Sequence, residues 1–98
     1  MKETTITAIL KEIRYEQHPI ENDEALKSYI KDAEYSINYD VGAKIDYDKD
    51  LEARKLLKYY VFYDRHKRLA EFKSMYEGDY SDLQAKYYKP TDVQWWIF

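Results

Sequence analysis

Residues 22–39 read NDEALKSYIKDAEYSINY, and this stretch predicts the fold class. Its apolar side chains recur every three or four positions, which places them on one face of a helix. Asn22 can cap this helix, and Asp23 and Glu24 suit the positive end of its dipole. We therefore expect an amphipathic helix that ends at about Asn38 or Tyr39. The apolar face of this helix contains Leu26, Tyr29, Ile30, Ala33 and Ile37.

A shorter helix is expected before this stretch, and a loop after it. Thr4 or Thr5 can cap the first helix, which should end near His18 because Pro19 disfavours helical geometry in the residue before it. The segment 40–48 is predicted to be a loop, with Gly42 available for a left-handed backbone. The apolar positions that predict the first helix are Ile6, Ile9, Leu10 and Ile13.

A long helix is predicted from about residue 48 to 77, ending at Gly78, the preferred residue just past a helix end. Its first and second halves present two different apolar faces, which overlap between residues 56 and 63. There the helix is apolar on nearly every side, so it should be buried on more than one side. It could be the central rod of a bundle, or a second protomer could cover it. The chain has twelve tyrosines, and these fit either an interface or a tyrosine-rich core.

A short helix over residues 80–88, ended by Pro90, completes the predicted elements. Asp64 and Arg68 are four residues apart on the long helix and are expected to pair. The predicted fold class is all-α. We expect a small antiparallel bundle of about four helices with a long central helix, formed by residues 1–88, and an extended C-terminal tail.

The tail, residues 89–98, contains both tryptophans of the chain. Large apolar side chains near a terminus indicate a docking segment or else the last piece of a core. The residues expected to dock are Val93, Trp95, Trp96, Ile97 and Phe98.

The sequence offers no enzymatic motif, and we expect neither a catalytic, a cofactor nor a metal site. There is no cysteine for a thiolate site or a disulfide. The series Asp46, Asp48 and Asp50 begins like a calcium loop, but Leu51 occupies the position that requires glycine. The favoured interpretation is that these acids gather at a helix N-terminus. His18 is not in a recognised metal-ligand spacing.

The net charge is −3 and the pI is about 5.4, which disfavours a duplex-binding domain. The alternative function is nonetheless a small DNA-binding or regulatory helical protein that uses Arg65, Lys67 and Arg68 on phosphates. No apolar run approaches the roughly 20 residues that span a bilayer. We therefore expect a soluble protein, made in the cytoplasm, without a membrane partner.

The order of elements resembles the small tailed-phage head-tail connector (adaptor) proteins, which are often described as phage DNA packaging proteins. The resemblance covers about residues 4–88. It includes Ala25-Leu26-Lys27-Ser28-Tyr29-Ile30-Lys31-Asp32-Ala33, an Asp-rich loop, a long aromatic helix and a box near the end in which Gln84 and Lys86 fit.

The resemblance implies a structural head-completion protein at the head-tail interface of the virion, made in the bacterial host. Its copies would form a ring, typically twelvefold, that docks on the portal protein after packaging and contacts the next head-completion or tail-completion protein. Genomic DNA would pass through the ring without specific binding. The tail would contact the portal. The residues expected to join neighbouring copies are Tyr59, Phe62, Tyr63, Arg65 and Arg68.

Overall fold

The computed structural model describes residues 1–89, and these form five helices without a strand. The helices are α1 (Glu3–Gln17), α2 (Asp23–Val41), α3 (Leu51–Arg65), α4 (Leu69–Met75) and α5 (Glu77–Lys86). The predicted all-α class is confirmed. None of the helices in residues 1–89 is both long enough and apolar enough to cross a membrane.

The first two helices lie where the sequence predicts them, except that α2 continues to Val41, two or three residues past its expected end and into the predicted loop. α1 ends at Gln17, and His18 then adopts a left-handed backbone with φ 49°. At the start of α2, the Asn22 side chain accepts a hydrogen bond from the Ala25 N–H at 2.9 Å. Gly42, with φ 79°, ends α2. The predicted threonine cap of α1 is wrong, because buried Thr5 donates to Asp48 Oδ2 at 2.7 Å instead.

The predicted long helix over residues 48–77 is wrong, because the chain turns twice within it. Lys67 adopts a left-handed φ of 58°, and the Arg68 N–H reaches back to the Tyr63 carbonyl at 2.8 Å. In an uninterrupted helix Phe72, nine residues after Tyr63, would lie about 180° away from it. The turn brings Phe72 back to the core, where it is fully buried.

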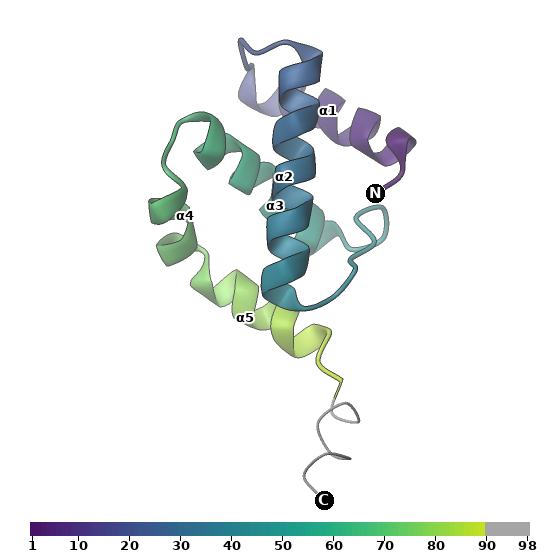
Figure 1. The fold of residues 1–98 in the computed structure, drawn as a ribbon, viewed down its shortest axis with the longest axis vertical. Coiled ribbons are helices and arrows are strands. Elements are labelled where there is room, and N and C mark those ends of the chain that lie inside the picture. Colours follow the sequence, from purple (N-terminus) through teal and green to yellow (C-terminus); the bar gives the residue numbers. More distant parts are fainter. Residues whose placement is uncertain (90–98) are drawn as a thin grey trace, which may run out of the picture.

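The second turn, at Tyr76, separates α4 from α5, so Gly78 lies inside α5 and does not end a helix. The predicted helix over residues 80–88 corresponds to α5, which begins three residues earlier. The longest helix is α2, which lies upright at the centre of Figure 1. The long central helix of the prediction is thus replaced by two shorter helices, α3 and α4.

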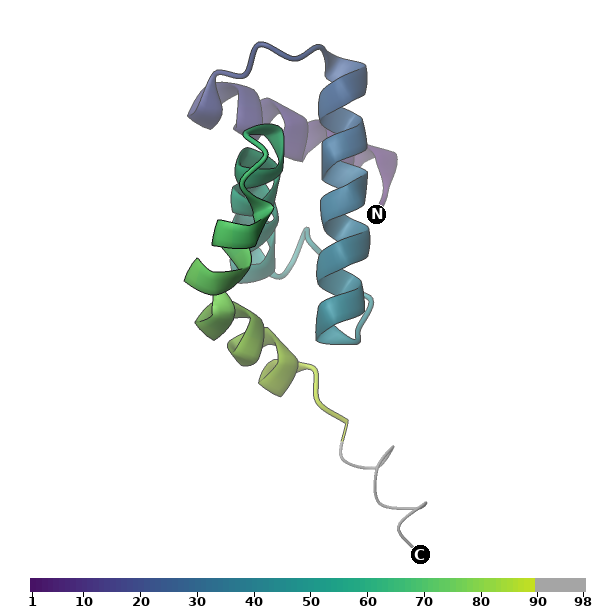
Figure 2. The same ribbon diagram turned by 60° about the vertical axis from the view of Figure 1, so that its left-hand side comes forward.

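α2 packs against α1, α3 and α5, and α3 packs in addition against α1 and α4. Figures 1 and 2 show α1 crossing one end of α2, whereas α5 lies near the other end. The core between these helices includes the predicted stripe of α2, whose members Leu26, Ile30, Ala33 and Ile37 are fully buried. α4 in turn packs against both α3 and α5.

Candidate functional site

An aromatic cluster joins α3 to α4 and the start of α5. Tyr76 is at its centre, with its ring centroid 4.8 Å from that of Phe72, 5.3 Å from that of Tyr59 and 6.0 Å from that of Tyr63. Tilted and edge-on pairs at these separations contribute stabilisation beyond their buried area. Burial, followed by the neighbouring Tyr63 and Tyr59, raises the pKa of Tyr76.

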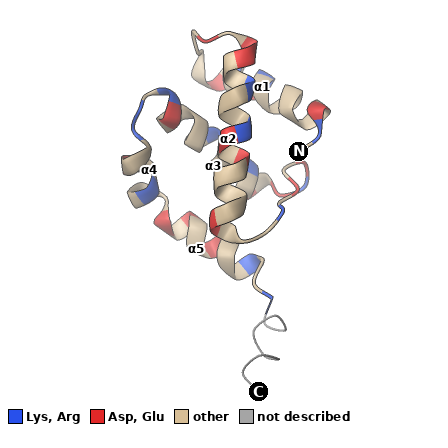
Figure 3. Ribbon diagram, viewed as in Figure 1, with Lys and Arg blue, Asp and Glu red and all other residues tan. Residues whose placement is uncertain are grey.

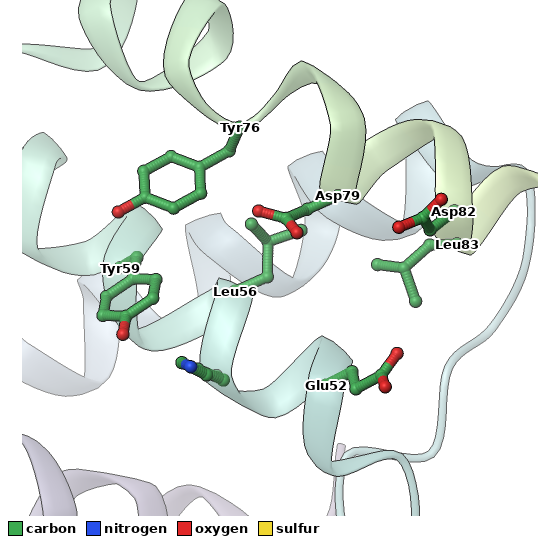
Figure 4. A pocket seen from close by; sticks show the side chains of 8 residues that line it. Glu52, Leu56, Tyr59, Tyr76, Asp79, Asp82 and Leu83 are labelled. Carbon is green, nitrogen blue, oxygen red and sulfur yellow. The ribbon is translucent and has the colours of Figure 1, made fainter.

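A groove of 360 Å³ opens beside this cluster, between α3 and α5. We call it the aromatic groove. Figure 4 shows the tyrosine rings at one end and the carboxylates along the rim. Leu56 and Leu83, each 3% exposed, are its most deeply buried apolar residues. The residues that line it are Glu52, Lys55, Leu56, Tyr59, Tyr76, Asp79, Asp82 and Leu83.

The rim of the aromatic groove offers mainly hydrogen-bond acceptors. Glu52 comes from α3, and Asp79 and Asp82 come from α5. Within residues 1–89 none of these three carboxylates forms an ion pair. The one cation of the lining, Lys55, has its Nζ 5.7 Å from the centroid of the Tyr59 ring. The groove therefore suits an apolar group that carries N–H or O–H donors.

Three of the five predicted subunit contacts lie together at the aromatic cluster. Tyr59 and Tyr63 are members of it, and the Arg68 guanidinium lies 5.9 Å from the Tyr63 ring centroid. The Tyr63 hydroxyl donates to Met75 Sδ at 3.1 Å. Arg68 bonds to Glu71 across the exposed surface of α4.

The other two predicted contacts have different surroundings. Phe62 packs on the His66 ring, with centroids 4.5 Å apart. The Arg65 side chain is only 5% exposed, and its Nε donates to Glu21 Oε1 at 3.1 Å. The same guanidinium also donates to Gln17 Oε1 at 2.9 Å. Arg65 therefore ties α3 to the segment between α1 and α2.

The predicted pair between Asp64 and Arg68 is wrong, because Arg68 binds Glu71 on α4 instead. Burial and the nearby Asp32 raise the pKa of Asp64. The turn at Lys67 moves Arg68 away from α3, which separates the two side chains that a continuous helix would bring together.

The basic residues at positions 65–68 do not form one cationic face. Arg65 is buried in its ion pair, and Arg68 is neutralised by Glu71. Lys67 is exposed on the turn. Figure 3 shows acidic residues interspersed with the basic ones along α3, α4 and α5. The charge pattern expected of a phosphate-binding surface is therefore interrupted.

The Asp-rich loop has structural roles, as its favoured interpretation predicted. Asp50 caps α3 through the Ala53 N–H at 3.0 Å. Asp50 Oδ2 also accepts from the Tyr87 hydroxyl at 2.6 Å and from Lys86 Nζ at 3.0 Å. Residues 1–89 contain no group of three His, Cys, Asp or Glu side chains that could hold a metal ion. Asp50 thus ties the end of α5 to the start of α3.

The predicted tail residues Val93, Trp95, Trp96, Ile97 and Phe98 lie outside the described residues. The described chain ends at Lys89, two residues after Tyr87, whose hydroxyl is bonded to Asp50. The end of α5 is therefore held beside Asp50.

Sequence reasoning did not single out the aromatic groove. Tyr76, Asp79 and Leu83 have helical spacing of three and four, but the continuous helix expected up to Glu77 assigned Tyr76 to a different element. The available signal was the mismatch between the two apolar faces of residues 51–76. That mismatch is what the turn at Lys67 resolves.

No protein-family model matches this chain, and no curated protein or solved structure is significantly similar to it. The assignment of a function therefore depends on the residues of the chain itself.

Proposed function

We propose that this chain is a structural head-completion adaptor of a tailed bacteriophage, located in the virion at the head-tail interface. In this proposal its helices form an antiparallel bundle, and its copies form a ring, twelvefold in the type it resembles. The ring docks on the portal protein after packaging and joins it to the next completion or tail protein. Genomic DNA passes through the ring without specific binding.

The anchor of α5 on Asp50 is the observation that carries the proposal. Hydrogen bonds from Tyr87 and Lys86 to this buried carboxylate hold the last described turn against α3. An apolar segment that begins at a fixed point of a folded domain is suited to docking, because the domain defines where the segment starts. The sequence after the anchor contains both tryptophans and Phe98.

The energetics favour docking by an assembled ring over docking by a single copy. Burying Trp95, Trp96, Ile97 and Phe98 would contribute roughly 8 kcal/mol in total. Ordering ten residues costs on the order of 10 kcal/mol. One tail is therefore near balance, whereas linked tails gain through effective concentration.

The contacts between copies are proposed at Tyr59, Tyr63 and Arg68. Tyr59 is 37% exposed, and the Arg68 side chain is more than half exposed, so both can meet a neighbouring copy. Phe62 and Arg65 support this surface from within the subunit through His66 and Glu21.

The test is co-sedimentation with tailless, DNA-filled heads or with purified portal protein. We expect the full chain to bind and a chain that ends at Lys89 to remain in the supernatant, because only the full chain has the apolar segment. Trp95→Ala with Trp96→Ala should behave like the shortened chain, and Tyr35→Ala on α2 is the matched aromatic control.

Equal binding by the full and shortened chains would move the portal contact onto the helices. Binding by neither chain would overturn the adaptor proposal. Salt-dependent binding of duplex DNA by the chain alone would then favour the alternative function, since phosphate contacts weaken steeply with salt.

A further inference from the structure

We infer that the aromatic groove between α3 and α5 binds the chain's own C-terminal segment, residues 90–98. The inference combines the geometry of the groove with the chemistry of the sequence that follows Lys89. It concerns the isolated chain and does not depend on a portal.

The described chain ends next to one end of the groove. Tyr87 donates to Asp50, the N-cap of α3, and Glu52 lies in the first turn of the same helix. Glu52 also lines the groove, whose far end is formed by Tyr59 and Tyr76, as Figure 4 shows. A segment that starts after Lys89 can therefore enter the groove at Glu52 and run toward the tyrosines.

The length of the segment is sufficient. From Glu52 to Tyr59, α3 rises about 10 Å at 1.5 Å per residue. Nine extended residues span up to about 30 Å, so residues 90–98 can cover the groove and still allow for a reversal of direction. Lys89 precedes Pro90, and a proline disfavours helical geometry in the residue before it. The chain therefore leaves the helical path of α5 before Pro90.

The side chains are complementary. Tryptophan presents a large apolar ring with one N–H donor and no acceptor. The groove provides Leu56 and Leu83 as buried apolar contacts, and Tyr59 and Tyr76 as aromatic ones. Its rim provides the carboxylates of Glu52, Asp79 and Asp82. In their ionised form these groups accept hydrogen bonds and cannot donate them. Each indole ring could be buried while its N–H donates to a carboxylate at the rim.

One consequence concerns the apolar segment itself. Exposed contiguous apolar side chains promote unwanted association. A groove in the same chain would cover Trp95 and Trp96 until a partner competes for them. Under the function proposed above, portal and groove would bind the same side chains in turn.

Intrinsic tryptophan fluorescence tests the inference directly, because the only two tryptophans of the chain are Trp95 and Trp96. In the full-length wild type we expect emission at shorter wavelength and severalfold weaker acrylamide quenching than in a peptide of residues 89–98. Tyr59→Ala should abolish most of this protection. Tyr35→Ala, which removes a 74% exposed tyrosine from α2, should not change it.

A cross-link provides a second measurement that does not require removing a groove residue's aromatic ring. The chain has no native cysteine, so Lys55→Cys with Ile97→Cys should form an intramolecular disulfide upon mild oxidation of dilute protein. Tyr35→Cys with Ile97→Cys is the matched control and should form it far more slowly. Circular dichroism checks that each variant keeps its helices.

Equal quenching in the wild type, Tyr59→Ala and the peptide would overturn the inference, as would equal cross-linking of the two cysteine pairs. Protection that increases with chain concentration would also overturn it, because the segment would then occupy the groove of a second copy. None of these outcomes involves portal protein. Failure here and failure in co-sedimentation are therefore distinguishable.

Discussion

Replacing Asp50 with alanine should destabilise the fold, because this one side chain supports both the start of α3 and the end of α5. The Asp50 carboxylate is buried, 7% exposed, and makes three hydrogen bonds. It accepts from the Ala53 N–H, from the Tyr87 hydroxyl and from Lys86 Nζ. Two of these bonds connect residues that are 36 and 37 positions apart in the sequence. The substitution therefore affects a helix cap and a tertiary contact together.

The expected loss follows from the individual contacts. Removing an N-cap side chain costs about 1 kcal/mol. The hydrogen bond from Tyr87 ends on a charged group and is worth about 1.5 to 3 kcal/mol. Lys86 is half-exposed, so its ion pair adds only a few tenths of a kcal/mol. We expect the free energy of unfolding to fall by about 3 kcal/mol in total, from these same contacts.

The assay is urea unfolding at pH 7, followed by far-ultraviolet circular dichroism, with Asp50→Asn and Tyr87→Phe as companions. Asparagine keeps one oxygen for the cap and presents its NH2 to Tyr87, whose hydroxyl can accept from it, but it has no charge, so Asp50→Asn should lose only about 1 kcal/mol. Tyr87→Phe should lose the Tyr87 contribution alone. A loss below about 0.5 kcal/mol for Asp50→Ala, or equal losses for alanine and asparagine, would refute the reasoning.

The same carboxylate should make the free energy of unfolding depend on pH. Burial acts to raise the pKa of Asp50, but hydrogen bonds from Tyr87, Ala53 and Lys86 outweigh it, and the net pKa is lowered. A group with a lowered folded-state pKa stabilises the fold fully above its unfolded pKa, near 3.9 for aspartate. That contribution is lost as the pH falls through the folded pKa. Below about pH 4, the wild type should therefore lose stability more steeply than Asp50→Ala.

Four further substitutions test the core and the turn at Lys67. Phe72→Ala should cost about 3 to 5 kcal/mol in urea unfolding, because Phe72 is fully buried and holds α4 against α3. A loss below about 1 kcal/mol would contradict the packing of α4. Lys67→Gly should stabilise the chain by up to about 1 kcal/mol, since Lys67 has a φ of 58°; a destabilised variant would argue against the turn. Tyr47→Phe should cost about 1 to 2 kcal/mol, because the buried Tyr47 hydroxyl bonds to Asn38 at 2.8 Å. Tyr80→Phe should instead be neutral or stabilising, because the buried Tyr80 hydroxyl has no partner among residues 1–89. Equal costs for the two tyrosine variants would contradict this contrast.

The sequence predicted α1 and α2 well, because their signals are local. The spacing of Leu26, Ile30, Ala33 and Ile37 determines a helix face without reference to the rest of the chain. Asn22 and Gly42 act on backbone groups within a few residues of themselves. The all-α class follows from these signals, and it is confirmed.

The turn at Lys67 was not predictable from local chemistry. Neither proline nor glycine occurs between Gly42 and Gly78, and lysine rarely adopts a left-handed backbone. The fold accepts this conformation because Phe72 can reach the core only after a change of direction. The mismatch between the two apolar faces was visible in the sequence, but burial of the helix on several sides explains such a mismatch equally well.

The candidate site depends still more on tertiary contacts. In the sequence, Asp50 is one of several acids near a helix N-terminus. Only the folded chain brings the Tyr87 hydroxyl to it. The aromatic groove likewise combines Tyr59 and Leu56 of α3 with Tyr76 and Leu83 from beyond the turn. Periodicity describes one element at a time, so it cannot identify a site formed between elements that a turn brings together.

The tyrosines show why composition alone cannot distinguish a core residue from an interface residue. Tyr47 is buried deep in the domain, whereas Tyr35 and Tyr39 are about three-quarters exposed and stack on each other on α2. A partly buried tyrosine at the edge of a small domain can satisfy its hydroxyl, as Tyr87 does at Asp50. The same side chain can remain exposed without aggregation because the hydroxyl is hydrated. What decides between the two roles is whether another element packs over the ring, as happens to Tyr80 even without a partner for its hydroxyl among residues 1–89, and that packing is defined by the fold.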